Sequence, residues 1–231
     1  MEAKPELPPL KKPLKIAIDG PAGAGKSTVS RAVADRLNIK YLDTGAMYRA
    51  ITLKIIREKV DLSDSEAIKN LLERTEINFG DDNQVMLDGE NVAAEIRLSH
   101  VNEMVSPVSS LSSVRRRLVA IQQSIAEEYD GIIMEGRDIA SRVIPDAGFK
   151  FYLDASIEER AKRRNREQKE KGIIVDEKSV ILEISNRDSI DSTRVDSPLT
   201  IVKDAIVIDT TGMTFKEVVD RIVETVSMAV R

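Results

Sequence analysis

The 231-residue sequence has no cysteine, no tryptophan and a single histidine. The lack of cysteine excludes thiol nucleophiles and redox pairs, and with only His100 left it removes almost every kind of zinc site. We expect His100 to lie at the surface or at a helix end rather than to act as a catalyst. Aromatic residues make up only 3% of the chain, which argues against a protein that stacks single-stranded nucleic acid on exposed rings.

Long apolar runs are also missing. No stretch approaches the roughly 20 apolar residues that span a bilayer, and residues 1–13, with four prolines, have no apolar run of the kind found in a signal peptide. We therefore expect a flexible tail over residues 1–13, with no assigned role, and a single domain over residues 14–231. The formal net charge of −4 argues against a protein that coats nucleic acid. These features predict a cytoplasmic protein with neither a nucleic-acid nor a membrane partner, and we expect it to act as a monomer.

Short apolar segments alternate with amphipathic helical patterns along the chain. This alternation predicts an α/β fold with a parallel sheet and helices on both faces. The expected strands cover residues 15–18, 131–135, 149–154 and 205–209. Capping boxes that mark helix starts are formed by Ser63 with Glu66, Ser156 with Glu159, and Thr214 with Glu217. The last helix should bury an apolar stripe of Phe215, Val218, Val219, Ile222, Val223 and Val226.

Two segments depart from this alternation. Residues 76–96 contain period-2 stretches around two turn signals, residues 80–83 and Asp88-Gly89, which predict a small antiparallel insert. The insert could lie over the substrate side of the site or be a peripheral decoration. Residues 158–172 are rich in arginine, and we interpret them as a short mobile cationic lid rather than a solvated surface helix.

Residues 20–27, Gly-Pro-Ala-Gly-Ala-Gly-Lys-Ser, match the pattern G-x-x-x-x-G-K-[ST] directly after an apolar strand. We call these residues the phosphate loop. Its glycines let successive backbone N–H groups face a polyphosphate, and the helix that begins near Lys26 adds its positive end. Lys26 should reach the β- and γ-phosphates and Ser27 the Mg²⁺ ion. The alternative is a glycine-rich turn that binds nothing. The predicted ATP contacts here are Gly20, Pro21, Ala22, Gly23, Ala24, Gly25, Lys26, Ser27 and Thr28.

Arginines follow several of the predicted strands and helices. Arg49 closes the run 41–49, Arg137 follows the strand at 131–135, and Arg194 lies at helical spacing from Arg187 and Asp191. A lone arginine–aspartate pair would be read as a structural salt bridge. Together with a phosphate loop, however, these arginines (49, 137 and 194) predict a clamp on a second anionic group.

Such a clamp favours phosphoryl transfer between two phosphorylated molecules. An acceptor phosphate is mostly a dianion at pH 7, so its oxygen attacks without a general base. The protein then has to neutralise charge and place the reactants in line, which we assign to Lys26, Arg137 and Arg194 with Mg²⁺. A carboxylate beside a guanidinium also matches the edge of cytosine, and Asp138 with Arg115 could supply that pair.

Taken in this order, the motifs GPAGAGKS, DTGAMYR, EGRD and RDxxDxxR resemble those of the bacterial cytidylate kinases, a family of nucleoside monophosphate kinases. The resemblance runs from about Lys15 to the C-terminus. It implies a P-loop α/β core, a β-rich insert in the monophosphate-binding region and a short lid. It also implies transfer of the γ-phosphoryl group of ATP to CMP or dCMP with Mg²⁺.

The resemblance further implies roles for individual residues. The phosphate of CMP would be held by Arg49, Arg137 and Arg194, near Thr44. Cytosine would be read by Ser106, Arg115 and Asp138, and the sugar would be bound by Arg187 and Asp191. In the lid, Arg160 and Arg164 are expected to bind ATP. Thr44 stands where some members have Ser, and Ser27 stands where some have Gly.

Two other functions stay open at this point. The chain could be a kinase for a different small acceptor, such as another nucleoside monophosphate or shikimate, although an arginine clamp disfavours acceptors without a phosphate. It could also be a nucleotide-dependent switch that signals to a partner. Such switches usually carry a base-reading N-K-x-D motif, which is absent from the sequence.

Overall fold

The computed structural model describes residues 13–80, 83–170, 172 and 175–230. The first half comprises β1 (Leu14–Asp19), α1 (Lys26–Leu37), β2 (Lys40–Asp43), α2 (Thr44–Glu58), α3 (Ser65–Glu73), β3 (Ile77–Phe79), β4 (Val85–Leu87), β5 (Glu90–Asn91), η1 (Glu95–Arg97) and α4 (Ser99–Ser109). The second half comprises α5 (Ser112–Glu127), β6 (Gly131–Gly136), η2 (Ile139–Val143), β7 (Phe149–Asp154), α6 (Ile157–Glu170), α7 (Glu177–Thr193), β8 (Ile206–Asp209) and α8 (Phe215–Val230). In the described part of the chain, no helix combines the length and apolar character needed to cross a membrane.

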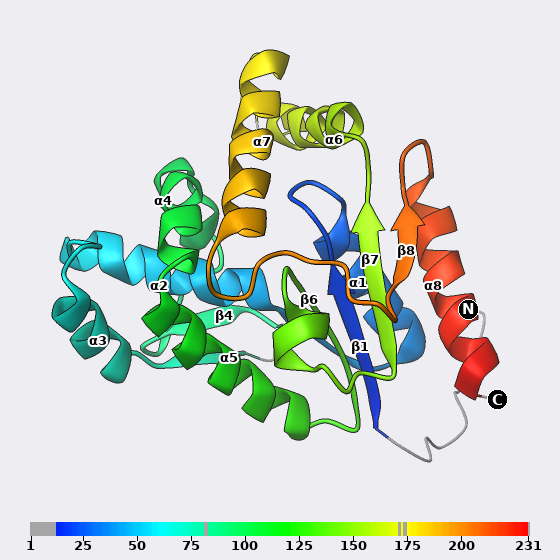
Figure 1. Ribbon diagram of the computed structural model, residues 1–231, viewed down its shortest axis with the longest axis horizontal. Coiled ribbons are helices and arrows are strands. Elements are labelled where there is room, and N and C mark those ends of the chain that lie inside the picture. The colour runs from blue at the N-terminus through cyan, green and yellow to red at the C-terminus, as the bar shows by residue number, and fades with distance from the viewer. Residues whose placement is uncertain (1–12, 81–82, 171, 173–174, 231) are drawn as a thin grey trace.

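A five-stranded parallel sheet with the order β2-β6-β1-β7-β8 forms the centre of the fold. β1 lies in the middle, so Ile16 pairs with Ile133 on one side and with Phe149 on the other. All strands point the same way, and their carboxyl ends therefore meet at one edge, where open α/β sheets bind ligands. The phosphate loop leaves β1 at this edge (Figure 1).

Helices cover both faces of the sheet, as predicted (Figure 1). In β1, Ile16 and Ile18 pack on one face with apolar residues of α1 and α8. Ala17, between them, packs on the opposite face with residues of α5 and η2. A strand that is buried on both faces reads as a continuous apolar run, which is why the sequence signal for these strands was strong. The predicted strands at 15–18, 131–135, 149–154 and 205–209 are confirmed within a residue or so at each end.

The predicted insert at 76–96 forms a three-stranded antiparallel sheet, β3-β4-β5. Its Asp88-Gly89 turn has φ of 50° and 84°, the left-handed conformation that a tight hairpin requires. The other predicted turn includes residues 81–82, which lie outside the described residues. Val85 and Leu87 pack into the core around α2, and just beyond the strands the carbonyl of Ile96 accepts a hydrogen bond from Arg49 at 3.2 Å. The end of the insert therefore lies on the side of the predicted acceptor clamp.

The helix starts follow two of the three predicted capping boxes. Thr214 and Glu217 form both hydrogen bonds of the box, at 2.7 and 3.3 Å, and Ser156 accepts one from the N–H of Glu159 at 3.2 Å. The box at Ser63 is wrong. Asp64, one residue later, caps α3 by accepting from the N–H groups of Glu66 and Ala67, because a carboxylate at this position satisfies two backbone donors.

Two further expectations need correction. Phe215 does not belong to the buried stripe of α8, since it begins the helix and is 55% exposed, whereas Val218, Ile222 and Val226 are buried. No strand was expected near Tyr41, but residues 40–43 form β2 at the edge of the sheet. Only its two central residues are fully buried, which left the apolar signal too short to recognise. His100 is exposed near the start of α4, as expected.

Candidate active site

The phosphate loop has a shape that its glycines alone permit. A Cβ on Gly20 would lie 2.1 Å from the carbonyl oxygen of Leu153 in β7, and Gly23 and Gly25 have φ of 78° and 86°. α1 begins directly after Gly25, and the Nζ of Lys26 donates a hydrogen bond to the carbonyl of Pro21 at 2.8 Å. The loop thus wraps around the lysine at the positive end of a helix, the arrangement expected of a polyphosphate site.

Glu135, at the end of β6, completes the metal side of this loop. The hydroxyl of Ser27 donates to its Oε1 at 2.6 Å, and the hydroxyl of Tyr41 does so at 3.4 Å. Burial raises the pKa of Glu135, and the neighbouring Asp43 adds to the effect. Glu135 belongs to the motif EGRD but had no predicted role. Its position at the carboxyl end of an apolar strand could have marked it as part of the site.

The donor atoms beside the loop suit Mg²⁺. A hydroxyl and a carboxylate supply hard oxygen ligands, and because Ser27 gives its hydrogen to Glu135, its oxygen lone pairs stay available to a metal. Among the described residues there is no group of three or more His, Cys, Asp or Glu side chains placed to hold a metal. Mg²⁺ is usually held by one or two protein oxygens together with water and substrate phosphates, so this pair fits it.

One buried ionisable residue, Lys26, lies within the phosphate loop, and another, Asp19, directly precedes it. Burial lowers the pKa of Lys26, as does the positive charge of Arg137, while Glu135 opposes the shift. Asp19, the last residue of β1, accepts from the backbone N–H groups of Ile139 at 2.9 Å and Ala140 at 2.8 Å. Burial raises the pKa of Asp19 to about 6. Asp19 thereby ties the end of the central strand to the turn that follows the predicted acceptor residues 137 and 138.

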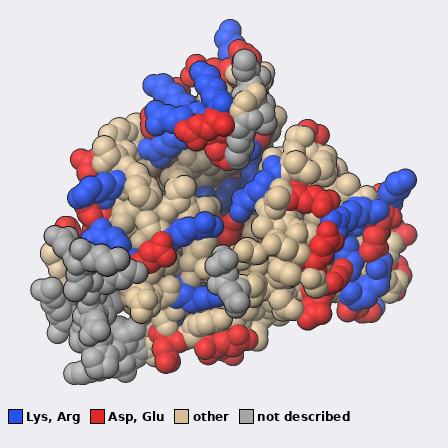
Figure 2. Space-filling view, turned by 180° about the vertical axis from the view of Figure 1, so that it is seen from behind, with Lys and Arg blue, Asp and Glu red and all other residues tan. Residues whose placement is uncertain are grey.

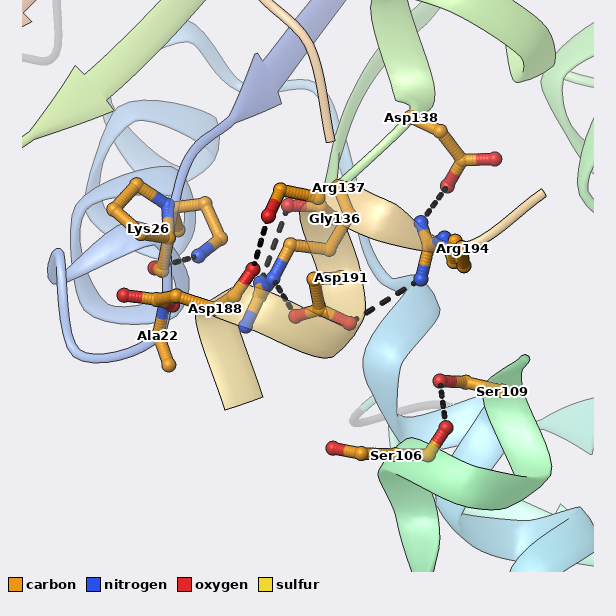
Figure 3. A network of polar contacts seen from close by, with 12 residues as sticks. Ala22, Lys26, Ser106, Ser109, Gly136, Arg137, Asp138, Asp188, Asp191 and Arg194 are labelled. Atoms are coloured by element: carbon orange, nitrogen blue, oxygen red, sulfur yellow. Dashed lines mark hydrogen bonds and ion pairs between the residues drawn. The ribbon is translucent and has the colours of Figure 1, made fainter. Parts of the chain in front are cut away.

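Asp191 of α7 lies between two of the predicted acceptor arginines (Figure 3). Arg137 donates through Nε to Asp191 at 2.8 Å, and a terminal nitrogen of Arg194 lies 3.3 Å from the other carboxylate oxygen. Burial opposes ionisation of Asp191, but the positive charges of Arg137, Arg187 and Arg194 lower its pKa. Burial and Arg137 lower the pKa of Arg187 to about 10. The structure therefore brings together residues 137, 187, 191 and 194, as the motifs predicted.

Arg49 approaches the same region from α2. It donates to the carbonyl of Ile96 at 3.2 Å and to the side chain of Asn102. Burial lowers the pKa of Arg49 to about 9, and the positive charge of Arg187 contributes next, which indicates that the two guanidinium groups face one region. Thr44 is buried at the start of α2, where its hydroxyl donates to the carbonyl of Glu135 at 2.7 Å.

Asp138 and Arg115, which the sequence could only suggest as a pair, form an ion pair in which both side chains are at most 5% exposed. Asp138 directly precedes η2, and Arg115 lies in α5. Arg115 also donates to the carbonyl of Ser109 at 3.1 Å and lies 5.2 Å above the ring of Tyr48. Arg194 reaches the same carboxylate at 3.8 Å. The predicted base-reading residues thus adjoin the arginine cluster. Ser106 is buried nearby in α4 (Figure 3).

The lid arginines differ from one another in their contacts. Arg160 donates to the carbonyl of Ala22 in the phosphate loop at 3.0 Å and pairs with Asp188 of α7. Arg164 pairs with Glu167 at 3.1 Å and lies 4.0 Å from Glu183, so it faces α7 rather than the loop. Arg163 donates to the carbonyl of Thr210 at 2.7 Å. Asp188 had no predicted role, although it belongs to the motif RDxxDxxR.

Seen from behind, the molecule is hollowed beneath α6 and α7, and lysine and arginine side chains lie within the hollow (Figure 2). The phosphate loop and the cluster of residues 137, 191 and 194 open toward one another at the carboxyl edge of the sheet (Figure 3). This arrangement can bind two anionic groups at once, because low solvent access strengthens the attraction of the buried cations.

Comparisons with known proteins agree with this geometry. The cytidylate kinase family model matches residues 16–228. A cytidylate kinase from Caldanaerobacter subterraneus subsp. tengcongensis is 52% identical over 213 residues, covering 92% of this chain and 94% of that protein. One from Alkaliphilus oremlandii is 48% identical over 210 residues, covering 91% and 96% of the two chains.

This chain belongs to the cytidylate kinase family. A solved structure of an uncharacterized protein from Eubacterium ventriosum has a TM-score of 0.54 at 15% identity and covers 94% of this chain and 99% of that one, which shows a shared fold alone. The family model and the two relatives match nearly the whole chain, and they confirm the resemblance to cytidylate kinases that the four motifs indicated.

Proposed function

We propose that this member of the cytidylate kinase family transfers the γ-phosphoryl group of ATP to CMP or dCMP, giving ADP and CDP or dCDP. The observation that carries the proposal is the Asp138–Arg115 pair beside the Arg137–Asp191–Arg194 cluster, at the same sheet edge as the phosphate loop. A phosphate site next to a carboxylate–guanidinium pair matches a phosphorylated cytosine nucleotide better than shikimate, which carries no phosphate.

The residues divide into a donor side and an acceptor side. Residues 20–28 bind ATP, and Lys26 contacts its β- and γ-phosphates. Arg160 and Arg164 of α6 also bind ATP. The phosphate of CMP is held by Arg49, Arg137 and Arg194, near Thr44. Cytosine is read by Ser106, Arg115 and Asp138, and the sugar is bound by Arg187 and Asp191.

The reaction needs little proton chemistry from the protein. An oxygen of the dianionic CMP phosphate attacks the γ-phosphorus, the bond to the β-phosphate oxygen breaks, and ADP leaves with that electron pair. Lys26, Arg137 and Arg194 stabilise the charge that develops between the reactants. A cationic hollow that excludes water also limits hydrolysis of ATP.

The proposal includes Mg²⁺ as the metal, because the Ser27 hydroxyl and the Glu135 carboxylate are suitable oxygen donors. When bound, Mg²⁺ would neutralise part of the charge on the ATP phosphates. We further propose that the protein acts as a monomer in the cytoplasm on small nucleotides and not on nucleic acid. The absence of cysteine and the net charge of −4 support this setting.

A coupled ADP-release assay tests the function directly. Purified protein is incubated with ATP, Mg²⁺ and, one at a time, CMP, dCMP, UMP, AMP, GMP and shikimate. CMP and dCMP should give the highest kcat/KM. Preferred turnover of another acceptor would assign a different kinase activity, and tight ATP binding without turnover of any acceptor would favour a nucleotide-dependent switch.

A further inference from the structure

Asp188 of α7 contacts the phosphate loop although the two lie 166 positions apart in the sequence. One of its carboxylate oxygens accepts the backbone N–H of Ala22 at 3.0 Å, and the other pairs with Arg160 of α6. Arg160 in turn donates to the backbone carbonyl of Ala22 at 3.0 Å. A single ion pair therefore holds both backbone polar groups of one loop residue.

The pair is anchored more firmly than a surface salt bridge. The Arg160 side chain is only 9% exposed, and its Nε donates to the carbonyl of Ala155 at 3.0 Å, which fixes the guanidinium plane. The next loop residue packs directly on α6, since a Cβ on Gly23 would lie 3.2 Å from the Cβ of Arg160. A hydrogen bond from a backbone N–H to a carboxylate is charge-assisted and stronger than a neutral one.

The same helix also contacts the acceptor side. Three residues beyond Asp188, and so on the same face of α7, Asp191 holds Arg137 at 2.8 Å and lies 3.3 Å from Arg194. One turn of helix thus carries a carboxylate that contacts the ATP side and a carboxylate that contacts the CMP side. This placement allows the roles of the two aspartates to be separated by experiment.

We propose that Asp188 is a positioning residue, which acts with Arg160 to hold the phosphate loop in the shape that receives ATP. This inference rests on the proposed function and adds a residue to it. Asp188 does not contact the nucleotide. It orients the peptide of Ala22, so that the amides that follow in the loop face the polyphosphate before ATP arrives, and this preorganisation lowers the cost of binding.

The test compares Asp188→Ala, Asp188→Asn and Asp191→Asn with the wild type. Glu177→Gln, a carboxylate removed from the exposed first turn of α7, is the matched control. The measurements are KM for ATP, KM for CMP, kcat, and the Kd of a non-hydrolysable ATP analogue with Mg²⁺ by calorimetry. Thermal melting of each variant establishes that the protein used is folded.

Asp188→Ala should raise KM for ATP and Kd for the analogue about tenfold, because one charge-assisted hydrogen bond to the loop is lost, while KM for CMP changes less than about twofold. Asp188→Asn should recover most of the ATP affinity, since its amide oxygen still accepts from Ala22. Asp191→Asn should show the opposite split, with KM for CMP raised. Glu177→Gln should match the wild type.

Three results would overturn the proposal: unchanged ATP affinity in folded Asp188→Ala, tighter ATP binding in that variant, or an equal rise of both KM values. Tighter binding would mean that the carboxylate competes with a phosphate for the Ala22 amide. If Asp188→Ala does not fold, Asp188→Asn and Arg160→Lys are measured by the same criteria, with a selective loss of ATP affinity expected for Arg160→Lys. Calorimetry measures ATP binding without turnover, so it tests this inference separately from the proposed function. A wild type that is inactive on CMP would contradict the proposed function, and ATP binding to the variants would still decide the role of Asp188.

Discussion

Lys26 shows how burial prepares a single residue for phosphate chemistry. It is buried, its Nζ bonds to the carbonyl of Pro21 in its own loop, and burial beside Arg137 lowers its pKa. A polyphosphate would replace that carbonyl as the partner of the ammonium group. The lysine is therefore held close to where negative charge must be stabilised, at little cost of reorganisation when ATP binds.

Replacement of this lysine should act mainly on catalysis. We expect Lys26→Ala to lower kcat by about a hundredfold or more, because the charge that the lysine stabilises grows as the phosphoryl group moves. Steady-state kinetics with saturating ATP and CMP would measure the effect. Lys203→Ala, which removes an exposed lysine, should keep the wild-type kcat. Near-normal turnover in Lys26→Ala would contradict the assigned role.

Asp138 has a different expected effect, on the choice and affinity of the acceptor. It is buried against Arg115, and both side chains are proposed to face the cytosine edge. Asp138→Ala should raise KM for CMP by about tenfold to a hundredfold and leave KM for ATP nearly unchanged, because a base-reading acceptor is lost and Arg115 stays unpaired. Asp146→Ala, at an exposed aspartate, is the matched control. Equal rises in both KM values would indicate a structural residue instead.

At the scale of elements, most of the central sheet could be predicted from the sequence. Strands that are buried on both faces appear as apolar runs, so the residues of β1, β6 and β7 were recognisable, and the hairpin turn at Asp88-Gly89 identified the insert. In β8 only Ile208 is buried, and this strand was recognisable because residues 205–208 are all apolar. β2 was missed because only its central residues, Tyr41 and Leu42, are buried. A run of two apolar residues is too short to indicate a strand, because the burial of Tyr41 and Leu42 comes from tertiary packing.

The candidate site was predictable as a set of residue types but not as a set of contacts. The motifs named most of the charged residues that gather at the sheet edge. The sequence suggested Asp138 and Arg115 as a pair but could not show that these residues, 23 positions apart, are in contact, and it gave no sign that Asp188 contacts Ala22, 166 positions away. Such pairings depend on how α5 and α7 pack against the sheet, and a local sequence pattern carries no information on that packing.

The junction of β1 with the phosphate loop provides a test at this scale. A side chain on Gly20 would meet the backbone of β7 at 2.1 Å and would require a φ of 152°. We expect Gly20→Ala to lower the free energy of unfolding by about 3 kcal/mol or more, since backbone atoms cannot move aside as a flexible side chain would. Urea denaturation would measure the loss. Gly148→Ala, where a Cβ would meet nothing within 4 Å, should stay within about 0.5 kcal/mol of wild type.

At the scale of the whole molecule, overall charge and local charge have opposite signs. The chain carries a formal net charge of −4, yet lysines and arginines lie in the hollow beneath α6 and α7 (Figure 2). Acidic residues elsewhere on the surface account for the negative total. This distribution concentrates positive charge in one place, where it favours the binding of small anionic nucleotides.

The free energy of unfolding should depend on pH partly through one buried carboxyl group, that of Asp19. Burial raises the pKa of Asp19 from 3.8 to about 6 in the folded chain, and we take the unfolded value as the ordinary one. Between these values the folded protein binds more protons than the unfolded one. The contribution of Asp19 to stability therefore falls as the pH rises from about 4 to about 6, and it changes little outside that window.

Asp19→Asn removes this titration and keeps one oxygen to accept from the N–H groups of Ile139 and Ala140. The free energy of unfolding of the wild type, minus that of Asp19→Asn, should be larger at pH 4 than at pH 7 by about 2 kcal/mol. This is less than the full pKa shift at about 1.4 kcal/mol per unit, because the unfolded carboxyl group is already partly ionised at pH 4. Urea denaturation of both proteins across this range measures the difference, and other carboxyl groups cancel in it. Parallel stability curves would mean that Asp19 titrates alike in both states, and that burial at the end of β1 is offset by its two backbone hydrogen bonds.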